Sequence, residues 1–301
     1  MRMSARSVRQ SPDRRGNLPW SWALAWLSVA ALPAAAADVN LLPRWAGPFA
    51  AGGGADATFL QIDSNWHGSQ VLWNDTTQTY GEGLPIGSFG WGTGIWGLAD
   101  WRAVQAGAAP GSSGAVPILR RWSGQVASIN FSNALYNTNY ADRWGPAALA
   151  PIFASGDPAS DQENWTAHLQ GYIRVTEAGS YNFSVLNDDG FFLTLTGEGG
   201  SQVSIGRDYL NDRDRLGFSS NLALSPGLYG LDLGMWNRQE AGVVDLRWMT
   251  PGTTTWALVP TANLLSTSAV PEPATALLSL AGLGLVLGWC RRQAAAHGHR
   301  A

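Results

Sequence analysis

Residues 171–190 read GYIRVTEAGSYNFSVLNDDG, and this stretch decides the fold class. In its second half, Tyr181, Phe183 and Val185 alternate with polar residues, a period of two that is typical of a β-strand with one buried face. Asp189-Gly190 follows at once, and this dipeptide is a common hairpin signal. The stretch therefore predicts a strand that ends in a tight turn.

The same alternation continues toward the C-terminus, with turn signals such as Ser225-Pro226-Gly227 and Pro251-Gly252 between the runs. No segment between the two ends shows a sustained helical period. We therefore expect an all-β fold, an antiparallel β-sandwich of the lectin-like kind. Its predicted core residues are Tyr181, Phe183, Val185, Leu193, Leu195, Leu246 and Trp248.

The N-terminal segment has the pattern of a signal peptide. Five arginines precede an apolar run from Trp20 to Leu32, which is followed by Pro33 and four alanines. A basic region, a hydrophobic region and a small-residue cleavage site form the secretory pattern. We expect residues 1–37 to be removed, so that the mature chain begins at Asp38.

The C-terminal segment has three parts in a fixed order. Residues Val270, Pro271, Glu272 and Pro273 precede an uncharged stretch of 17 residues, Ala274 to Cys290, and then Arg291 and Arg292. Seventeen apolar residues are the lower limit for a membrane-spanning helix, and the arginines would hold its far end in the cytoplasm. A plain membrane anchor would show the same helix.

This order of motif, helix and basic residues over 270–292 resembles the PEP-CTERM sorting signal of Gram-negative bacteria. The resemblance implies an exosortase-type membrane protease that cuts near the Pro-Glu-Pro motif after transient membrane anchoring. It also implies that the cargo is released or attached at the cell surface, often where exopolysaccharide is produced. We therefore expect a surface or extracellular-matrix location.

Composition excludes several classes of function. Between residues 38 and 290 there are 11 arginines and 21 acidic residues, a net charge of about −10, which disfavours nucleic-acid binding. The single cysteine, Cys290, lies in the terminal segment, so the exported part has no disulfide and no thiolate site. With His67 and His168 as its only histidines, a multi-histidine metal site is not expected either.

Residues 38–117 form a Gly- and Trp-rich region without a clear strand or helix period. Two interpretations of its indoles stay open: an exposed aromatic platform for sugar rings, or a core and interface packed on the following domain. Residues 106–115, which are all Ala, Gly, Pro or Ser, predict a linker or long loop. The tryptophans concerned are Trp66, Trp73, Trp91, Trp96 and Trp101.

Residues 118–265 contain a longer pattern, densest over 164–250. A Gly-x-Tyr-x-Phe strand (179–183) leads to Asn187-Asp188-Asp189-Gly190, and a strand ending in Trp248 follows about 60 residues later. This order resembles the protective-antigen-type domain (PA-fourteen), a β-sandwich found in toxins, glycosidases and adhesins. The sugar-contacting loops of the adhesins have no recognisable counterpart here.

The resemblance implies a carbohydrate site at Asp188 and Asp189, with Asn187 beside them. In lectin-like members of that family two adjacent aspartates hold a calcium ion that also binds sugar hydroxyls. Two consecutive carboxylates supply the hard oxygen ligands that calcium takes. The alternative is a structural turn, and the acidic loop 208–214 is expected to be a solvated loop rather than a second source of ligands.

No catalytic constellation is present in the sequence. The spacing of the carboxylates selects no glycosidase pair, and no nucleophile-elbow, zinc-protease or phosphate-loop motif occurs. We therefore expect no enzymatic activity and no catalytic residues. Two functions stay open: a carbohydrate-binding protein associated with exopolysaccharide or biofilm matrix, and a structural matrix protein that binds no glycan.

Overall fold

The structure is a computed structural model of the whole chain, and it describes residues 38–47, 49–66, 71–74, 79–82, 93–107, 116–153 and 160–269. All of these residues belong to one of two compact units, Ala36–Ala301, and the other unit is Met1–Ala35. The predicted signal peptide (1–37) and sorting signal (270–292) lie outside the described residues. Within the described ranges, no helix is both long and apolar enough to cross a membrane.

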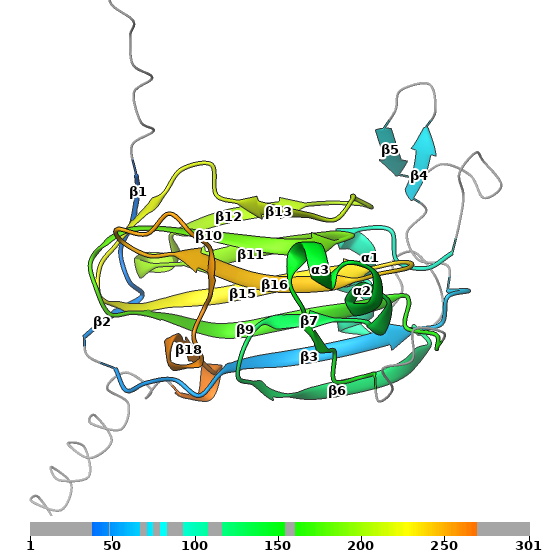
Figure 1. Cartoon of the computed structure of the whole chain (residues 1–301), viewed down its shortest axis with the longest axis horizontal. Helices are drawn as coiled ribbons and strands as arrows, with labels where there is room; N and C mark the ends of the chain where they lie inside the picture. Colours follow the sequence, from blue (N-terminus) through cyan, green and yellow to red (C-terminus); the bar gives the residue numbers. More distant parts are fainter. Residues whose placement is uncertain are drawn as a thin grey trace, which may run out of the picture. The chain divides into compact units, whose positions relative to one another are not determined.

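Two sheets, each with eight strands in the described residues, form the fold (Figure 1). The first sheet has β10 and β16 at its centre, and the second has β15 and β9. The first contains, in spatial order, β1 (Val39–Leu41), β14 (Leu222–Leu224), β10 (Gly179–Asp188), β16 (Val243–Met249), β7 (Asn130–Ser132) and β8 (Ala148–Leu149), with β13 (Asp214–Gly217) on β10 and β17 (Ala257–Leu258) on β16. The second contains β12 (Gln202–Arg207), β11 (Gly190–Thr196), β15 (Gly227–Asn237), β9 (Trp165–Val175), β3 (Ala55–Ile62) and β6 (Ile118–Val126), with β18 (Leu264–Leu265) on β9 and β2 (Trp45–Ala46) on β15.

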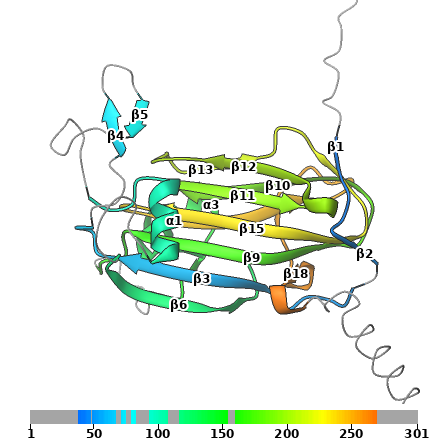
Figure 2. The same ribbon diagram turned by 180° about the vertical axis from the view of Figure 1, so that it is seen from behind.

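Short elements complete the described part of the chain. A separate hairpin pairs β4 with β5, and α1 lies across the second sheet, where it contacts β15, β9 and β3 (Figure 2). The remaining helices sit between β7 and β8. The bounds are β4 (Val71–Asn74), β5 (Thr79–Glu82), α1 (Leu98–Ala106), α2 (Ala134–Asn139), α3 (Ala141–Trp144) and three 3₁₀ turns at Glu198–Gly200, Thr261–Asn263 and Thr267–Ala269.

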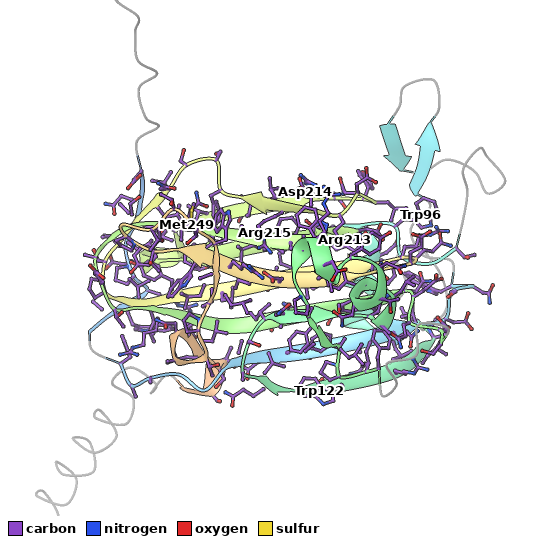
Figure 3. All side chains as sticks on the ribbon, viewed as in Figure 1. Trp96, Trp122, Arg213, Asp214, Arg215 and Met249 are labelled. Atoms are coloured by element: carbon purple, nitrogen blue, oxygen red, sulfur yellow. The ribbon has the colours of Figure 1, made fainter. Side chains whose placement is uncertain are left out.

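The core between the two sheets confirms the predicted β-sandwich. All seven predicted core residues are buried in one cluster, and Phe183, Val185 and Leu193 have no exposed surface. The aromatic residues Tyr181, Phe183 and Trp248 pack on one another with ring centroids 5.8–6.5 Å apart. Side chains throughout the sandwich are shown in Figure 3.

Two details of the predicted fold class are wrong. The β1–β14 and β7–β8 pairs are parallel. Neither pair is joined by a tight hairpin, which would make it antiparallel: β14 lies far from β1 in the sequence, and α2 and α3 lie between β7 and β8. The fold is also not purely β, since α1, α2 and α3 are helical. These helices are at most nine residues long, too short to show the sustained period of 3.6 that predicts a helix.

The Gly- and Trp-rich region contributes directly to both sheets. β3 pairs with β9 and with β6 over most of its length, and β1 pairs with β14. The predicted boundary at 117/118 therefore does not separate two folded parts. β3 was missed because its core face carries Ala55 and Ala57 next to three glycines, which gives a weak alternation in the sequence.

Three of the five tryptophans in this region are described with their side chains. Trp66, Trp96 and Trp101 are each at most 8 % exposed, and Trp66 and Trp101 share a second apolar cluster with Leu60 and Ile62. For these three residues the core-and-interface interpretation is confirmed. The side chains of Trp73 and Trp91 lie outside the described residues.

Candidate functional site

The paired aspartates lie at the turn between β10 and β11, where the two sheets are connected. Asp188 ends β10, Gly190 begins β11, and the Asp188–Asp189 peptide bond is cis. A Cβ at Gly190 would come within 2.2 Å of the Trp236 indole, so only glycine fits at this position. The Asp-Asp-Gly motif therefore fixes a close approach between the turn and β15.

Asp189 is tied to the neighbouring strand β15 and the loop that follows it. Its backbone N–H donates to the Trp236 carbonyl at 2.9 Å, and its Oδ2 accepts from the Arg238 backbone N–H at 2.7 Å. Because these contacts use the backbone of β15 and of the residue after it, the position of the carboxylate is set by the sheet itself.

Asp188 forms an ion pair with Arg213 across the first sheet. An Arg213 Nη2 donates to Asp188 Oδ2, and the two side chains are only 11 % and 13 % exposed. The register of β10 with β13 pairs Asn187 with Asp214, so Arg213 stands one position beyond the last pair, opposite Asp188. Figure 3 shows Arg213 next to Asp214 and Arg215 at the start of β13.

The guanidinium of Arg213 has further neighbours, among them the Tyr136 ring, whose centroid lies 5.6 Å from its Cζ. It donates to the Ala241 carbonyl at 2.8 Å, and its Cζ lies 3.5 Å from the centroid of the Tyr140 ring, a cation–π contact. Its Nε is buried and has no hydrogen-bond partner among the described residues. Arg213 therefore links the turn, the loop after β15 and the helical segment, with one donor unsatisfied.

Burial raises the pKa of both carboxyl groups well above the ordinary range. The pKa of Asp188 rises to about 8, first through desolvation and then through the negative charge of Asp189, and Arg213 opposes this rise. The pKa of Asp189 rises to about 7, mainly through desolvation, against the Arg238 N–H and the nearby arginine charges. The two carboxyl groups are largely withdrawn from water, so positive charge beyond that of the nearby arginines would stabilise their ionised forms.

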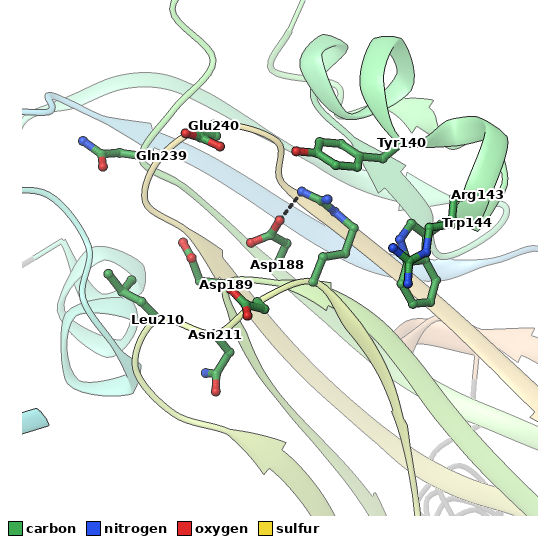
Figure 4. A pocket seen from close by; sticks show the side chains of 11 residues that line it. Tyr140, Arg143, Trp144, Asp188, Asp189, Leu210, Asn211, Gln239 and Glu240 are labelled. Carbon is green, nitrogen blue, oxygen red and sulfur yellow. Dashed lines mark hydrogen bonds and ion pairs between the residues drawn. The ribbon is translucent and has the colours of Figure 1, made fainter. Parts of the chain in front are cut away.

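A pocket of about 500 Å³ opens over this pair (Figure 4). Its floor is Asp188 and Asp189, and three segments form its walls: the helical segment, the loop between β12 and β13, and the loop between β15 and β16. The lining residues are Tyr140, Arg143, Trp144, Asp188, Asp189, Leu210, Asn211, Asp212, Arg213, Gln239 and Glu240.

Hydrogen bonds fix the walls of the pocket to the sandwich. Asn133 caps α2 by accepting from the Tyr136 N–H at 3.0 Å, and its Nδ2 donates to the Glu240 carbonyl of the opposite wall. The Trp236 indole N–H donates to the Tyr209 carbonyl at 3.1 Å, which holds the loop between β12 and β13. Asp208 Oδ1 accepts from the Leu98 N–H at the start of α1. The pocket is therefore largely preformed.

The three predicted site residues are consecutive in the chain, but their side chains have different surroundings. Asp188 and Asp189 line the pocket, whereas Asn187 is fully buried beneath them and donates from Nδ2 to the Asp189 carbonyl at 2.8 Å. In the acidic loop 208–214, Asn211 and Asp212 line the pocket and Asp208 holds α1. The predicted sorting residues lie outside the described part of the chain.

Several pocket residues were not predicted. Arg213, Tyr140 and Trp144 come from segments 25 to 49 residues away from the turn, and Gln239 and Glu240 come from a loop about 50 residues further along the chain. Only Arg213 left a signal in the sequence, as the single basic residue in the loop 208–213. The others depend on strand register and loop path, which the sequence pattern does not give.

The oxygen atoms near the turn that could act as metal ligands are of the kind that calcium takes. Besides the two carboxylates, the Oδ1 atoms of Asn187 and Asn237 are buried and have no hydrogen-bond partner among the described residues. These hard oxygens suit calcium rather than zinc. Within the described ranges, no cluster of three or more His, Cys, Asp or Glu side chains forms a metal-binding group, so a bound calcium would need amide or carbonyl oxygens as well.

Comparison with known protein families supports the resemblance found at the C-terminal end of the sequence. Residues 269–292 match the family model described as the PEP-CTERM protein-sorting motif. No curated protein is similar enough in sequence to count as a relative.

Three solved structures illustrate the fold similarity, each with a TM-score below 0.5. The PA14 domain of the MpAFP antifreeze protein is 18 % identical and gives a TM-score of 0.41, with 76 % of this chain and 98 % of that chain covered. The PA14 sugar-binding domain of an RTX adhesin is 14 % identical, with a TM-score of 0.39 and coverages of 72 % and 99 %. The epithelial adhesin 9 A domain of Candida glabrata, in complex with Galβ1-3GlcNAc, is 13 % identical, with a TM-score of 0.43 and coverages of 76 % and 95 %.

Proposed function

We propose that this chain is an exported, surface-sorted protein without enzymatic activity that binds carbohydrate in the pocket over Asp188 and Asp189. The observation that carries the proposal is the composition of this pocket. Polar side chains from three separate loops converge on an open space of about 500 Å³, and two aromatic rings stand in one of its walls. A preformed hollow with a few convergent polar groups is the usual form of a small-ligand site.

The polar groups of the pocket match the hydroxyls of a sugar. Carboxylates such as Asp189 and Glu240 accept hydrogen bonds, and the carboxamides of Asn211 and Gln239 both donate and accept. Sugar hydroxyls also donate and accept, so such a set can satisfy two neighbouring hydroxyls at once. Four acidic residues in the lining disfavour an anionic ligand, so a neutral sugar unit is the expected occupant.

The aromatic wall supplies the apolar part of the site. Trp144 is partly exposed, and the guanidinium of Arg143 lies 5.0 Å from its ring. An indole presents a large flat surface at a low entropy cost, and the C–H face of a pyranose ring packs against such a surface. Tyr140 lines the same wall, but its ring is already in contact with Arg213.

Calcium is the proposed cofactor of this site. Asp188 and Asp189 would hold the ion, with the carboxamide oxygens of Asn187 and Asn237 as further candidates. When bound, calcium neutralises buried carboxylates and accepts hydroxyl oxygens of a ligand in its remaining coordination positions. The raised pKa values of the pair support this proposal, because they show that burial makes the charged carboxylates unfavourable and a bound cation would offset this cost.

The sorting motif leads to the proposed location and the first partner. The matched residues 269–292 include Val270, Pro271, Glu272 and Pro273, and we infer that an exosortase-type protease cuts near them after transient anchoring by the helix that ends at Arg291 and Arg292. The product would then reach the cell surface or matrix of a Gram-negative bacterium, where exopolysaccharide is the expected glycan. Mass spectrometry of the native surface product should find neither residues 1–37 nor residues 281–301.

A glycan array tests the binding proposal. The full-length chain, in detergent, should bind a restricted set of neutral glycans, and the Asp188→Asn/Asp189→Asn double variant should lose this binding. The Asp56→Asn/Asp232→Asn double variant is a charge-matched control, because neither residue lines the pocket. Equal binding by wild type and the pocket variant would refute the site, and no binding by the wild type would favour the structural matrix protein.

A further inference from the structure

Arg213 holds the position of a cation at the aspartate pair. Its guanidinium contacts two oxygens, Asp188 Oδ2 and the Ala241 carbonyl. A carboxylate oxygen and a backbone carbonyl oxygen are both ligands of the kind that calcium takes. The protein's own side chain therefore occupies two oxygens that a metal ion at this pair would use.

We propose that Arg213 and a divalent cation exclude each other at Asp188, so that Arg213 sets how tightly the pocket binds calcium. This inference deepens the calcium part of the proposed function. A guanidinium within hydrogen-bond distance of the carboxylate places a positive charge within a few ångströms of any ion on the same group, and like charges at such a distance repel strongly in a half-buried site. Calcium binding therefore requires Arg213 to withdraw.

Strand pairing positions Arg213 next to Asp188. The backbone of Arg213 stands opposite Asp188 by continuation of the β10–β13 register, because Arg213 directly precedes Asp214, which pairs with Asn187. The loop before it is fixed at Tyr209, whose carbonyl accepts from the Trp236 indole N–H. Arg213 therefore faces the carboxylate because of strand pairing, and not through the chance position of a long surface side chain.

The surroundings of Arg213 also leave it displaceable. Its Nε has no hydrogen-bond partner among the described residues although it is buried, so the guanidinium is imperfectly satisfied. Asp188 and Asp189 are adjacent at the turn, and both line the pocket. A divalent ion that binds both carboxylates offers more charge at the same place.

Calcium titration calorimetry on the full-length chain in detergent, with no glycan present, tests the inference. The neutral variants Arg213→Met and Arg213→Gln should bind calcium at least about tenfold more tightly than wild type, because a repelling charge is gone. Arg213→Lys retains the charge and should bind calcium nearly as the wild type does. Arg207→Met is the control for net charge, because Arg207 pairs with Asp214 and does not line the pocket.

The outcomes separate cleanly. Tighter calcium binding by the two neutral variants, with Arg207→Met unchanged, supports exclusion by Arg213. If neither neutral variant binds calcium more tightly, or if Arg207→Met gains as much, the inference is wrong. Melting curves check that each variant is folded, and either neutral variant suffices if the other does not fold. Because no glycan is present, a failure of carbohydrate binding cannot produce or hide the result.

Discussion

Asp188 and Asp245 are both aspartates of the first sheet with little exposed surface and with arginine partners, yet their surroundings differ. Both oxygens of Asp245 are engaged: Arg215 donates to Oδ1 at 3.0 Å, and Arg247 donates to both oxygens at 3.0–3.1 Å. Asp188 has one arginine on one oxygen and a second carboxylate, Asp189, directly beside it. The hydrogen-bonded cluster of Asp245 has two arginines for one carboxylate, whereas the cluster of Asp188 has one arginine for two carboxylates.

The difference separates a structural ion cluster from a candidate binding site. Because both oxygens of the buried Asp245 carboxylate already accept hydrogen bonds from two guanidiniums, neither is left free to bind a ligand, and the cluster stabilises the sheet. The Asp188–Asp189 pair has only one guanidinium hydrogen-bonded to it, desolvation raises the pKa of both groups, and the pair lines an open pocket; these features are typical of functional sites. A third pair, Arg207 with Asp214, lies near the surface, where water screens it.

Removing the Asp245 carboxylate should have the largest effect on stability. In Asp245→Ala, Arg215 and Arg247 lose their common partner while Arg215 stays only 14 % exposed. Breaking a buried pair in this way costs about 3–5 kcal/mol of unfolding free energy. Urea denaturation followed by tryptophan fluorescence measures the change, and a loss below about 1 kcal/mol would contradict a structural role for this cluster.

Removing the charges of both Asp188 and Asp189 should affect stability much less. In Asp188→Asn/Asp189→Asn, the loss of Arg213's charged partner destabilises the fold, whereas the loss of two desolvated, mutually repelling carboxylates stabilises it. Because these effects oppose each other, we expect the unfolding free energy to stay within about 1 kcal/mol of wild type. The calcium-induced rise in melting temperature, which follows from binding to the folded state only, should disappear. Melting curves with calcium and with a chelator measure both effects. A variant that loses stability like Asp245→Ala would place the pair among the structural clusters.

The surface pair should matter least. Arg207 and Asp214 are 27 % and 49 % exposed, so their ion pair is screened by solvent. Arg207→Met should change the unfolding free energy by less than about 0.5 kcal/mol. The same urea titration checks this value, and a loss comparable to that of Asp245→Ala would show that burial is not what distinguishes the three pairs.

The sequence predicted the sandwich core because strands with one buried face repeat every second residue. Phe183, Val185 and Leu193 follow this period, and they are fully buried. The sequence pattern did not predict β3, because the small residues Ala55 and Ala57 on its core face give a weak alternation of apolar and polar residues. It did not predict α1 either, because nine residues are too few to show a clear helical period. Local pattern therefore gave the fold class, but not the full membership of each sheet.

The candidate site was predictable only where one segment carries it. Asp188 and Asp189 are adjacent in the sequence, so the motif located the floor of the pocket. Arg213 and Glu240 reach the pocket through strand register and loop path, and no periodicity reports such contacts. Asn187 was predicted among the sugar contacts; its fully buried side chain supports the turn by donating a hydrogen bond to the Asp189 carbonyl.

Titration of the best-bound glycan from the array into the full-length chain tests the central claim, that the pocket over Asp188 and Asp189 binds carbohydrate. Wild type and Asp56→Asn/Asp232→Asn should bind with the same Kd. Asp188→Asn/Asp189→Asn should bind at least about tenfold more weakly, because it loses the carboxylates that we propose accept hydrogen bonds from sugar hydroxyls and hold the cation. Equal Kd values for all three proteins would contradict the claim and place carbohydrate binding elsewhere on the molecule.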